Sequence, residues 1–265
     1  MCEICDPKKK YDNCICNKDW KNFDETLINI NNFSSNILEK KLKISTLTLC
    51  CNFNNLINLD KFKLLYYYSL KDVKKFYNSA VFSWHTKYQQ ASNVSIKLFS
   101  NGKVQVAGCK TIQSCAYIIR KAFNRLIKSD CFDKKENALI SDMRICMINS
   151  DFKIKNIIYQ DKLCEILSNN SIHTNGNFIS IVYQPIKYPA INTKFISDNE
   201  IMNYHQHNLK HGLKKTFENK LSILIFRSGS IIITGGKIID NYLEAYIYIL
   251  NLIEKNNKDV LIYND

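Results

Sequence analysis

The sequence predicts an α+β fold in which an antiparallel sheet carries its helices on one face. The first observation is a duplication: residues 94–110 (VSIKLFSNGKVQVAGCK) recur as residues 221–237 (LSILIFRSGSIIITGGK). Each copy is two short strands around a glycine turn, followed by a glycine and a lysine before a helix. The second observation is the order of elements in each half, which is strand, helix, three strands and helix. Runs of strands between helices favour α+β over an alternating α/β fold.

Hydrophobic periodicity places the elements of the first half. It predicts strands at 42–51, 79–88, 94–99 and 104–108, and helices at 58–77 and 111–128. The second half repeats the plan, with predicted strands at 143–149, 177–184, 221–227 and 231–235 and helices at 158–168 and 238–254. The domain boundaries that follow are a Cys-rich appendage at 1–38, a first repeat at 39–130 and a second at 131–265, with an insertion at about 188–219.

Strand alternation separates the two faces of the first hairpin. Val94, Ile96, Leu98, Val104 and Val106 form an apolar set that should meet the helices. The opposite, open face then carries Ser95, Lys97, Phe99, Lys103, Gln105 and Ala107. A three-residue loop, Asn101-Gly102-Lys103, keeps these faces apart, whereas a two-residue turn would mix them. Phe99 is therefore expected to lie exposed beside Gln105.

Composition and charge limit the class of protein. The chain has 265 residues, 46% of them hydrophobic, and a formal net charge of +13. Residues 1–130 hold 21 Lys and Arg against 10 Asp and Glu, while residues 131–265 hold 16 against 14. A basic half suits a polyanion such as nucleic acid, and the alternative is a solvated basic surface. No apolar run has the length of a membrane span, and the N-terminus lacks the apolar middle of a secretion signal, so we expect an intracellular protein.

The duplicated FSNGK and FRSGS hairpins, each followed by G-C-K or G-G-K, resemble the TATA-box-binding protein (TBP) family over roughly residues 40–258. The resemblance implies a TBP-like saddle, a curved antiparallel sheet with helices on the convex face. In that family the concave face lies on the DNA minor groove, and four Phe side chains wedge between base steps. The divergence of the chain, its N-terminal appendage and its AT-rich codon flavour suggest a large DNA virus as the source.

The family pattern assigns the four wedges by position. Phe99 and Phe226 precede the two hairpin turns. Their mates are Phe82, 17 residues before Phe99, and Phe178, which begins a segment similar to a family strand. The alternative is that these four are core Phe residues.

The resemblance also implies further DNA-binding residues. Hairpin and helix-start positions expected near phosphates are Asn101, Lys103, Lys110, Arg227, Ser228 and Lys237. Positions expected to line the concave face are Ile44, Thr46, Ile145, Leu224, Ile232 and Thr234. Leu42 and Met143 align with two family asparagines that hydrogen-bond minor-groove acceptors, so base discrimination should be weak.

The expected function is that of a TBP-like transcription initiation factor that binds and bends AT-rich promoter DNA. Arg120, Lys121, Arg125 and Lys128, outside the apolar stripe of the 111–128 helix, form a predicted partner surface. The partner would be RNA polymerase or a TFIIB-like factor. The first alternative is a TBP-fold protein-interaction module without autonomous or TATA-specific DNA binding. The other is a nucleic-acid enzyme domain, but the chain has no room or residues for a catalytic partner.

The N-terminal cysteines are the candidate metal ligands. Cys2, Cys5, Cys14 and Cys16 supply four thiolates, enough for a structural zinc, and the alternative is a tail with free thiols. No other cofactor is expected. No nucleophile, paired carboxylates or phosphate loop stands out, so we expect no enzyme. The compartment would be the nucleus or, for a viral protein, the host cytoplasm, virus factory and virion.

Overall fold

The computed structural model describes residues 25–26, 28–29, 32, 35–66, 71–84, 94–171, 176–211, 217 and 219–263, with only the backbone of 66, 71–75 and 205–211. Its described residues form two compact units. Unit 1 is Thr46–Met147, and unit 2 joins the residues up to Ser45 to Ile148–Asp265. β1 (Leu38–Asn52) and β6 (Ser141–Ile154) each contribute one part to either unit. The units therefore differ from the linear boundaries drawn from the repeat.

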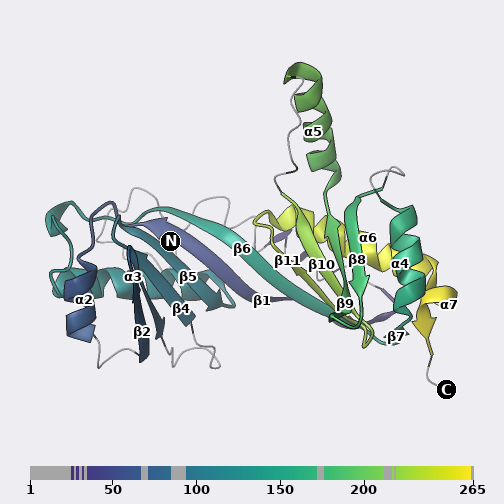
Figure 1. The fold of residues 1–265 in the computed structure, drawn as a ribbon, viewed down its shortest axis with the longest axis horizontal. Coiled ribbons are helices and arrows are strands. Elements are labelled where there is room, and N and C mark those ends of the chain that lie inside the picture. Colours follow the sequence, from purple (N-terminus) through teal and green to yellow (C-terminus); the bar gives the residue numbers. More distant parts are fainter. Residues whose placement is uncertain are drawn as a thin grey trace. The chain divides into compact units, whose positions relative to one another are not determined.

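Unit 1 is a sheet covered by two helices. Its strand order is β2 (Lys71–Phe76), β3 (Ser79–Trp84), β4 (Val94–Phe99), β5 (Lys103–Cys109), β1 and β6. The pairs from β2 to β1 are antiparallel. The helices are α2 (Leu59–Tyr66) and α3 (Ile112–Lys128), and a short 3₁₀ turn, η1, covers Lys135–Asn137 (Figure 1).

Unit 2 has the corresponding strand order. It runs β8 (Phe178–Gln184), β9 (Tyr188–Phe195), β10 (Leu221–Phe226), β11 (Ser230–Thr234), β6 and β1. Its helices are α4 (Gln160–Asn169), α5 (Asp198–His211), α6 (Ile239–Lys255) and α7 (Asn257–Val260). β7 (Ile157–Ile158) pairs with β12 (Leu261–Ile262), and α5 projects away from the rest of the unit (Figure 1). Within the described part of the chain, no helix is long and apolar enough to cross a membrane.

The α+β class is confirmed, and so is the division of the first hairpin into two faces. Val94, Ile96 and Leu98 are buried, whereas Ser95, Lys97 and Phe99 are only partly covered. The buried set packs under α3, which presents Ala116 and Ile119 among its buried residues. Unit 2 repeats the pattern: Ile223, Ile225, Ile231 and Ile233 are buried, and α6 contributes Tyr246 and Ile249 to the same core.

Two strands of the main sheet, β2 and β9, were not predicted from the sequence, and neither were the short strands β7 and β12. The helix expected over 58–77 ends at Tyr66, and β2 follows it. Residues 188–195, assigned to the insertion, form β9, which pairs with both β8 and β10. Within the predicted insertion at about 188–219, the described part that has no counterpart in unit 1 is therefore the region of α5, between β9 and β10. The correspondence of strand orders also shows that β8 matches β2 and that β9 matches β3.

Both hairpin turns pack in the same way on an adjacent segment of the polypeptide, at the end of β1 and of β6 respectively. Each turn has three residues, Ser100–Gly102 and Arg227–Gly229, one residue earlier than expected in the first hairpin. Gly102 and Gly229 have φ of +84° and +83°, a region in which glycine avoids strain. Their carbonyls accept hydrogen bonds of 2.9 Å from Phe53 and Ile154. The turns are thus fixed by backbone contacts as well as by their own conformation.

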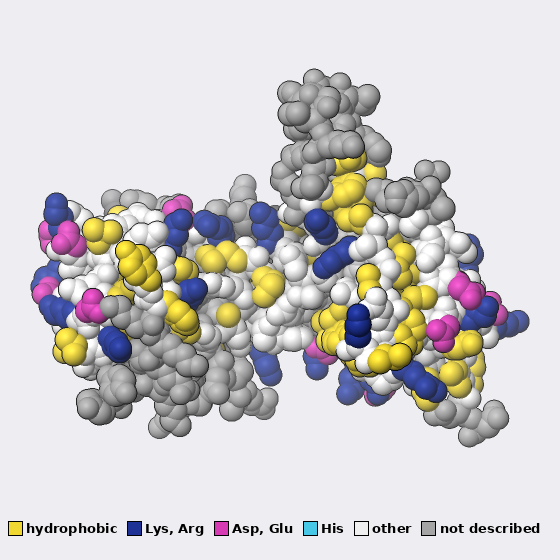
Figure 2. Space-filling view, viewed as in Figure 1, with side chains coloured by type: hydrophobic (Ala, Val, Ile, Leu, Met, Phe, Trp, Pro, Cys, Tyr) yellow, Lys and Arg dark blue, Asp and Glu magenta, His cyan; other side chains and the backbone are white. Residues whose placement is uncertain are grey.

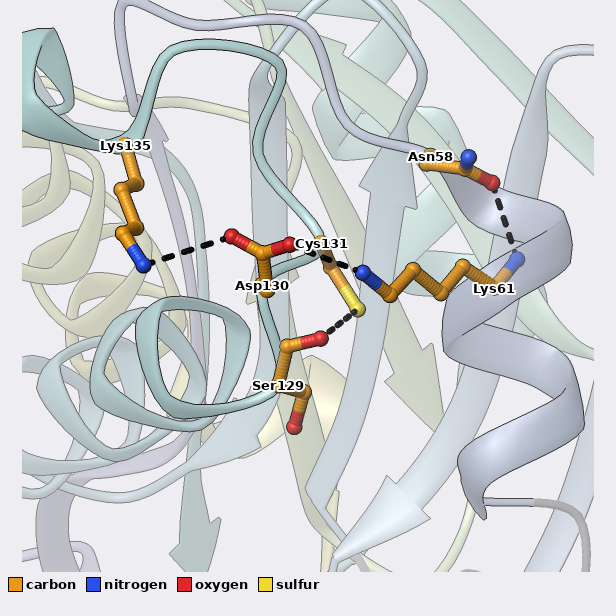
Figure 3. A network of polar contacts seen from close by, with 6 residues as sticks. All are labelled: Asn58, Lys61, Ser129, Asp130, Cys131 and Lys135. Carbon is orange, nitrogen blue, oxygen red and sulfur yellow. Dashed lines mark hydrogen bonds and ion pairs between the residues drawn. The ribbon is translucent and has the colours of Figure 1, made fainter.

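A polar network fixes α2 to the segment that follows α3 (Figure 3). Asn58 Oδ1 accepts from the Lys61 backbone N–H at 2.8 Å, a typical N-cap contact. The Lys61 ammonium lies 3.0 Å from the Asp130 carboxylate, which also pairs with Lys135 at 3.4 Å. The hydrogen bond from Lys61 lowers the pKa of Asp130. These exposed ion pairs add little stability, and they join α2 to the segment that follows α3.

Candidate functional site

The face of the unit 1 sheet turned away from its helices is the first part of the candidate site. Cross-strand pairing places Lys97 opposite Gln105 on one side and Val81 on the other. We call this surface the unit 1 open face; its members on β3, β4 and β5 are Ser79, Val81, Ser83, Ser95, Lys97, Phe99, Lys103, Gln105 and Ala107.

Phe99 lies on the unit 1 open face, as expected, and it has an aromatic neighbour that the sequence did not reveal. Phe76, at the end of β2, pairs with Ser79 and is 55% exposed. The Lys97 ammonium lies 4.8 Å from the centre of the Phe99 ring and 6.0 Å from that of Phe76. Cation–π attraction therefore holds a positive charge between two accessible rings.

The structure contradicts the prediction that Phe82 is a wedge on the open face. It is 1% exposed and packs on the helix side, with its ring centre 5.3 Å from that of Phe62 in α2. The cause is register: Ser79 is opposite Phe99, and Phe82 is opposite the buried Ile96. A count of 17 residues ignores the length of the connection between β3 and β4. It selects Phe82, three positions after the residue that pairs with Phe99, and an odd number of positions along a strand places a side chain on the other face of the sheet.

The unit 2 open face is defined in the same way. Leu224 lies opposite Ile232 on β11 and Asn192 on β9, and Ile232 lies opposite Asp151 on β6. The members of this surface are Tyr188, Ala190, Asn192, Lys194, Ser222, Leu224, Phe226, Ser230, Ile232, Thr234, Asn149, Asp151 and Lys153. The predicted lining residues Leu224, Ile232 and Thr234 are thus on this face.

The aromatic neighbour of Phe226 is Tyr188, and Phe178 is wrong as a wedge. The rings of Tyr188 and Phe226 meet edge to face with centres 6.1 Å apart, and Tyr188 is 46% exposed. Phe178 is fully buried against Phe195 and Tyr248 of α6. Its strand, β8, corresponds to β2 rather than β3. The Tyr188-Pro189 pair at the start of β9 is the signal that could have marked this aromatic neighbour of Phe226.

Ile44 and Ile145 also lie away from the open faces. Lys43 and Ser45, on either side of Ile44, both contact the Asp151 carboxylate of the unit 2 open face. Strand alternation therefore turns Ile44 to the helix side. Ile145 is in the same situation between Arg144 and Cys146, which both interact with Cys50 opposite Gln105.

Two further positions of β1 were assigned from the family alignment, Thr46 as a lining residue and Leu42 at the place of an asparagine. Thr46 is half-buried on β1, two residues before Thr48, which pairs with Ala107 of the unit 1 open face. Leu42, aligned with a family asparagine, is buried in unit 2.

The predicted phosphate-contacting residues are all accessible or close to the surface. Asn101, Lys103, Arg227 and Ser228 are exposed at or beside the two hairpin turns, and Lys110 and Lys237 are exposed just before α3 and α6. Thr111 caps α3 by accepting from Ser114 N at 3.2 Å, which fixes the helix start next to Lys110. The structure thus presents these cations to solvent, and their role stays a prediction.

Carboxylates on the unit 2 open face were not predicted. Lys43 lies 3.3 Å from Asp151, and Lys153 lies 2.8 Å from Glu39. The hydrogen bond from Lys153 lowers the pKa of Glu39. Each carboxylate is thus matched by a lysine. The unit 1 open face, by contrast, carries Lys97 between its rings.

The surface around β8 and β9 is partly apolar. Val182, Ile186 and Tyr188 are exposed there, and Figure 2 shows hydrophobic side chains with Lys and Arg near them on the visible surface of this unit. β8 is also the edge strand of its sheet.

The basic residues of α3 are not equally available. Lys121 is exposed, with its ammonium 4.7 Å from the Tyr117 ring centre, and Lys128 is exposed at the end of the helix. Arg125 is half-buried with its guanidinium 4.8 Å from the Trp84 ring centre, and Arg120 is half-buried as well. Lys121 and Lys128 are therefore the accessible part of the predicted partner surface.

The candidate zinc ligands Cys2, Cys5, Cys14 and Cys16 lie outside the described residues. Among the residues that the structure describes, no group of three or more His, Cys, Asp and Glu side chains could hold a metal.

The chain is similar to known proteins in sequence and in structure. The chain matches no protein-family model. It is 26% identical over 269 residues to a TATA-box-binding protein-like protein of Acanthamoeba polyphaga mimivirus, covering 84% of this chain and 68% of that protein. Its structure is similar to that of Methanococcus jannaschii TBP, with a TM-score of 0.55 and 18% identity over 81% of this chain and 98% of that one. The chain has the TATA-box-binding protein fold, and its resemblance to the TATA-box-binding protein-like family is confirmed.

Proposed function

We propose that the chain is a transcription initiation factor whose two open faces bind the minor groove of AT-rich promoter DNA and bend it. One observation carries the proposal: among the residues that the structure describes, each unit has one sheet face turned away from its helices, with a pair of accessible aromatic rings on it. These pairs are Phe76 with Phe99 and Tyr188 with Phe226. Apolar and aromatic side chains inserted between base steps unstack them and kink the duplex.

Residues of the open faces other than the aromatic rings also fit a minor-groove contact. Leu224 and Ile232 are partly covered apolar side chains on strands. Burying such side chains against DNA removes apolar surface from water, which makes the free energy of binding more favourable. The exposed cations Lys103, Arg227 and Lys237 would then contact phosphates, which position a protein without reading its sequence. Sequence preference would come mainly from how easily AT-rich steps bend.

Recruitment of the transcription machinery is the second part of the proposal. Lys121 and Lys128 give α3 an accessible positive charge. A partner with an acidic surface, on RNA polymerase or a TFIIB-like factor, would complement it.

One observation favours the alternative, a TBP-fold protein-interaction module without autonomous DNA binding. Asp151 and Glu39 place carboxylates on or beside the unit 2 open face. Carboxylates oppose binding to a polyanion, although Lys43 and Lys153 offset them.

Salt dependence separates the two functions. We expect affinity for an AT-rich duplex to fall steeply with salt, because each phosphate contact releases a counterion. Lys237→Ala should lower the slope of log affinity against log salt by about one. Fluorescence anisotropy at several salt concentrations measures both values.

The matched control is Lys162→Ala. Lys162 lies on α4 and is paired with Glu165 at 2.9 Å, so its removal should leave the slope unchanged. If the purified chain shows no salt-dependent affinity for duplex DNA yet retains binding to polymerase or a TFIIB-like factor, the interaction-module function replaces the proposed one.

A further inference from the structure

The unit 2 open face has a hydrogen-bond acceptor on β6. Asp151 on β6 lies opposite Ile232 and is 34% exposed at its side chain. Lys43 Nζ is 3.3 Å from one carboxylate oxygen, and the Ser45 hydroxyl donates to the other. A carboxylate has about four lone-pair sites, so these two contacts leave acceptor capacity toward the open face.

The corresponding position of unit 1 has different chemistry. Cys50 on β1 lies opposite Gln105 as Asp151 lies opposite Ile232. Cys146 and Arg144 stand next to Cys50 as Ser45 and Lys43 stand next to Asp151. Burial and the neighbouring Cys146 thiol raise the pKa of Cys50 to about 12, so that it is a neutral thiol at physiological pH. The two units therefore offer a carboxylate and a weakly polar thiol at matching places.

The carboxylate and the thiol interact differently with the base edges in the minor groove. A·T and T·A pairs present only acceptors there, whereas a G·C pair adds the exocyclic amino group of guanine as a donor. A carboxylate is repelled by acceptors and accepts from that donor. A neutral thiol is a weak partner for either edge.

We propose that Asp151 is a specificity-determining residue that accepts a hydrogen bond from the guanine amino group in the minor groove. The base pair that faces Asp151 is then G·C, in either orientation, within an otherwise AT-rich site. The base pair that faces Cys50 has no such requirement. The site is therefore asymmetric, and it fixes the direction in which the protein lies on DNA. This inference rests on the proposed minor-groove function.

The test compares guanine with inosine, which lacks only the minor-groove amino group. A single G·C pair is placed in turn at each step of an AT-rich duplex, and a matched series carries I·C at the same steps. We expect the full chain to bind G·C about tenfold more tightly than I·C at one step or two adjacent steps on one side of the site, as for one well-made base contact. Competition gel-shift assays measure the ratio at each step.

Three variants locate the effect. Asp151→Leu, which removes the acceptor, should abolish the G·C over I·C ratio while binding the all-A·T duplex at least as tightly as the parent, which also shows that it folds. Asp151→Asn keeps one acceptor oxygen but adds a donor that suits the A·T acceptors, so it should retain a reduced ratio and bind the all-A·T duplex more tightly than the parent. Cys50→Asp should create a second G·C-preferring step on the other side of the site.

Two results overturn the inference. If the parent binds AT-rich duplexes but treats G·C and I·C alike at every step, Asp151 does not read guanine, and the proposed function stands. If the parent binds no duplex at all, the proposed function fails together with the inference.

Discussion

Phe178→Ala is expected to lower the free energy of unfolding by about 3–5 kcal/mol, the usual cost of emptying a buried Phe site. Phe178 is fully buried between Phe195 and Tyr248 of α6, so its removal leaves a cavity where β8 packs under the helix. Phe226→Ala should cost about 1 kcal/mol or less, because the ring is only partly covered on the open face. Urea unfolding followed by circular dichroism gives both values.

The same contrast is expected in unit 1 between Phe82 and Phe99. Phe82→Ala removes a buried ring that packs on Phe62 of α2, whereas Phe99→Ala removes one from the open face. Equal losses of stability for the two members of either pair would contradict the assignment of faces.

Gly229→Ala is expected to destabilise the chain by at least about 2 kcal/mol, more than a left-handed backbone alone costs. Gly229 has φ of +83°, and a Cβ there would lie 2.5 Å from the Ile154 carbonyl oxygen and 2.8 Å from that of Asn156. Both contacts are backbone atoms, so the turn would have to leave its docking site. Thermal unfolding of the variant measures the loss.

Gly235 supplies the control within the same unit. Its φ is +97°, but the nearest atom to an added Cβ, Ser222 Oγ, is 3.7 Å away. Gly235→Ala should therefore show only the strain of the left-handed conformation, about 1–2 kcal/mol. If Gly235→Ala proves as costly as Gly229→Ala, the close docking of the turn is not what makes the Gly229 position sensitive.

The hairpins and the helices after them were predictable from the sequence because local patterns determine them. The alternation in 94–99 gave β4 with its correct bounds, and the apolar stripe in 111–128 gave α3 to within one residue. The glycines showed where the turns fall. Phe99 and Phe226 were placed correctly since they belong to these same local units.

The wedge mates Phe82 and Phe178 could not be placed because long-range register decides which face a strand residue occupies. Ser79 pairs with Phe99 across the connection between β3 and β4, and no local pattern encodes that offset. β2 is a short edge strand rich in lysine, which is typical of edge strands. It is too short for its hydrophobic periodicity to distinguish a strand from a continuation of the preceding helix. β9 begins with Tyr188 and Pro189 and carries three consecutive polar residues, Asn192, Thr193 and Lys194, so no clear alternation marks it as a strand and it was assigned to the insertion.

The ion pair of Lys43 with Asp151 was hidden for a different reason. It joins β1 to β6, and both strands divide between the units, a feature that linear domain boundaries exclude. Residues more than a hundred positions apart came together through topology alone.

Bending of DNA by the open faces is the central claim, and fluorescence energy transfer between the ends of an AT-rich duplex measures it directly. The parent should shorten the end-to-end distance, and the double variant Phe99→Ala, Phe226→Ala should lose the bend and about tenfold or more in affinity, since each base–ring contact is worth about 1–3 kcal/mol. The control Tyr117→Ala, Tyr159→Ala removes exposed aromatics outside the open faces and should bend DNA as the parent does. A double Phe variant that folds, binds and bends like the parent would contradict the account.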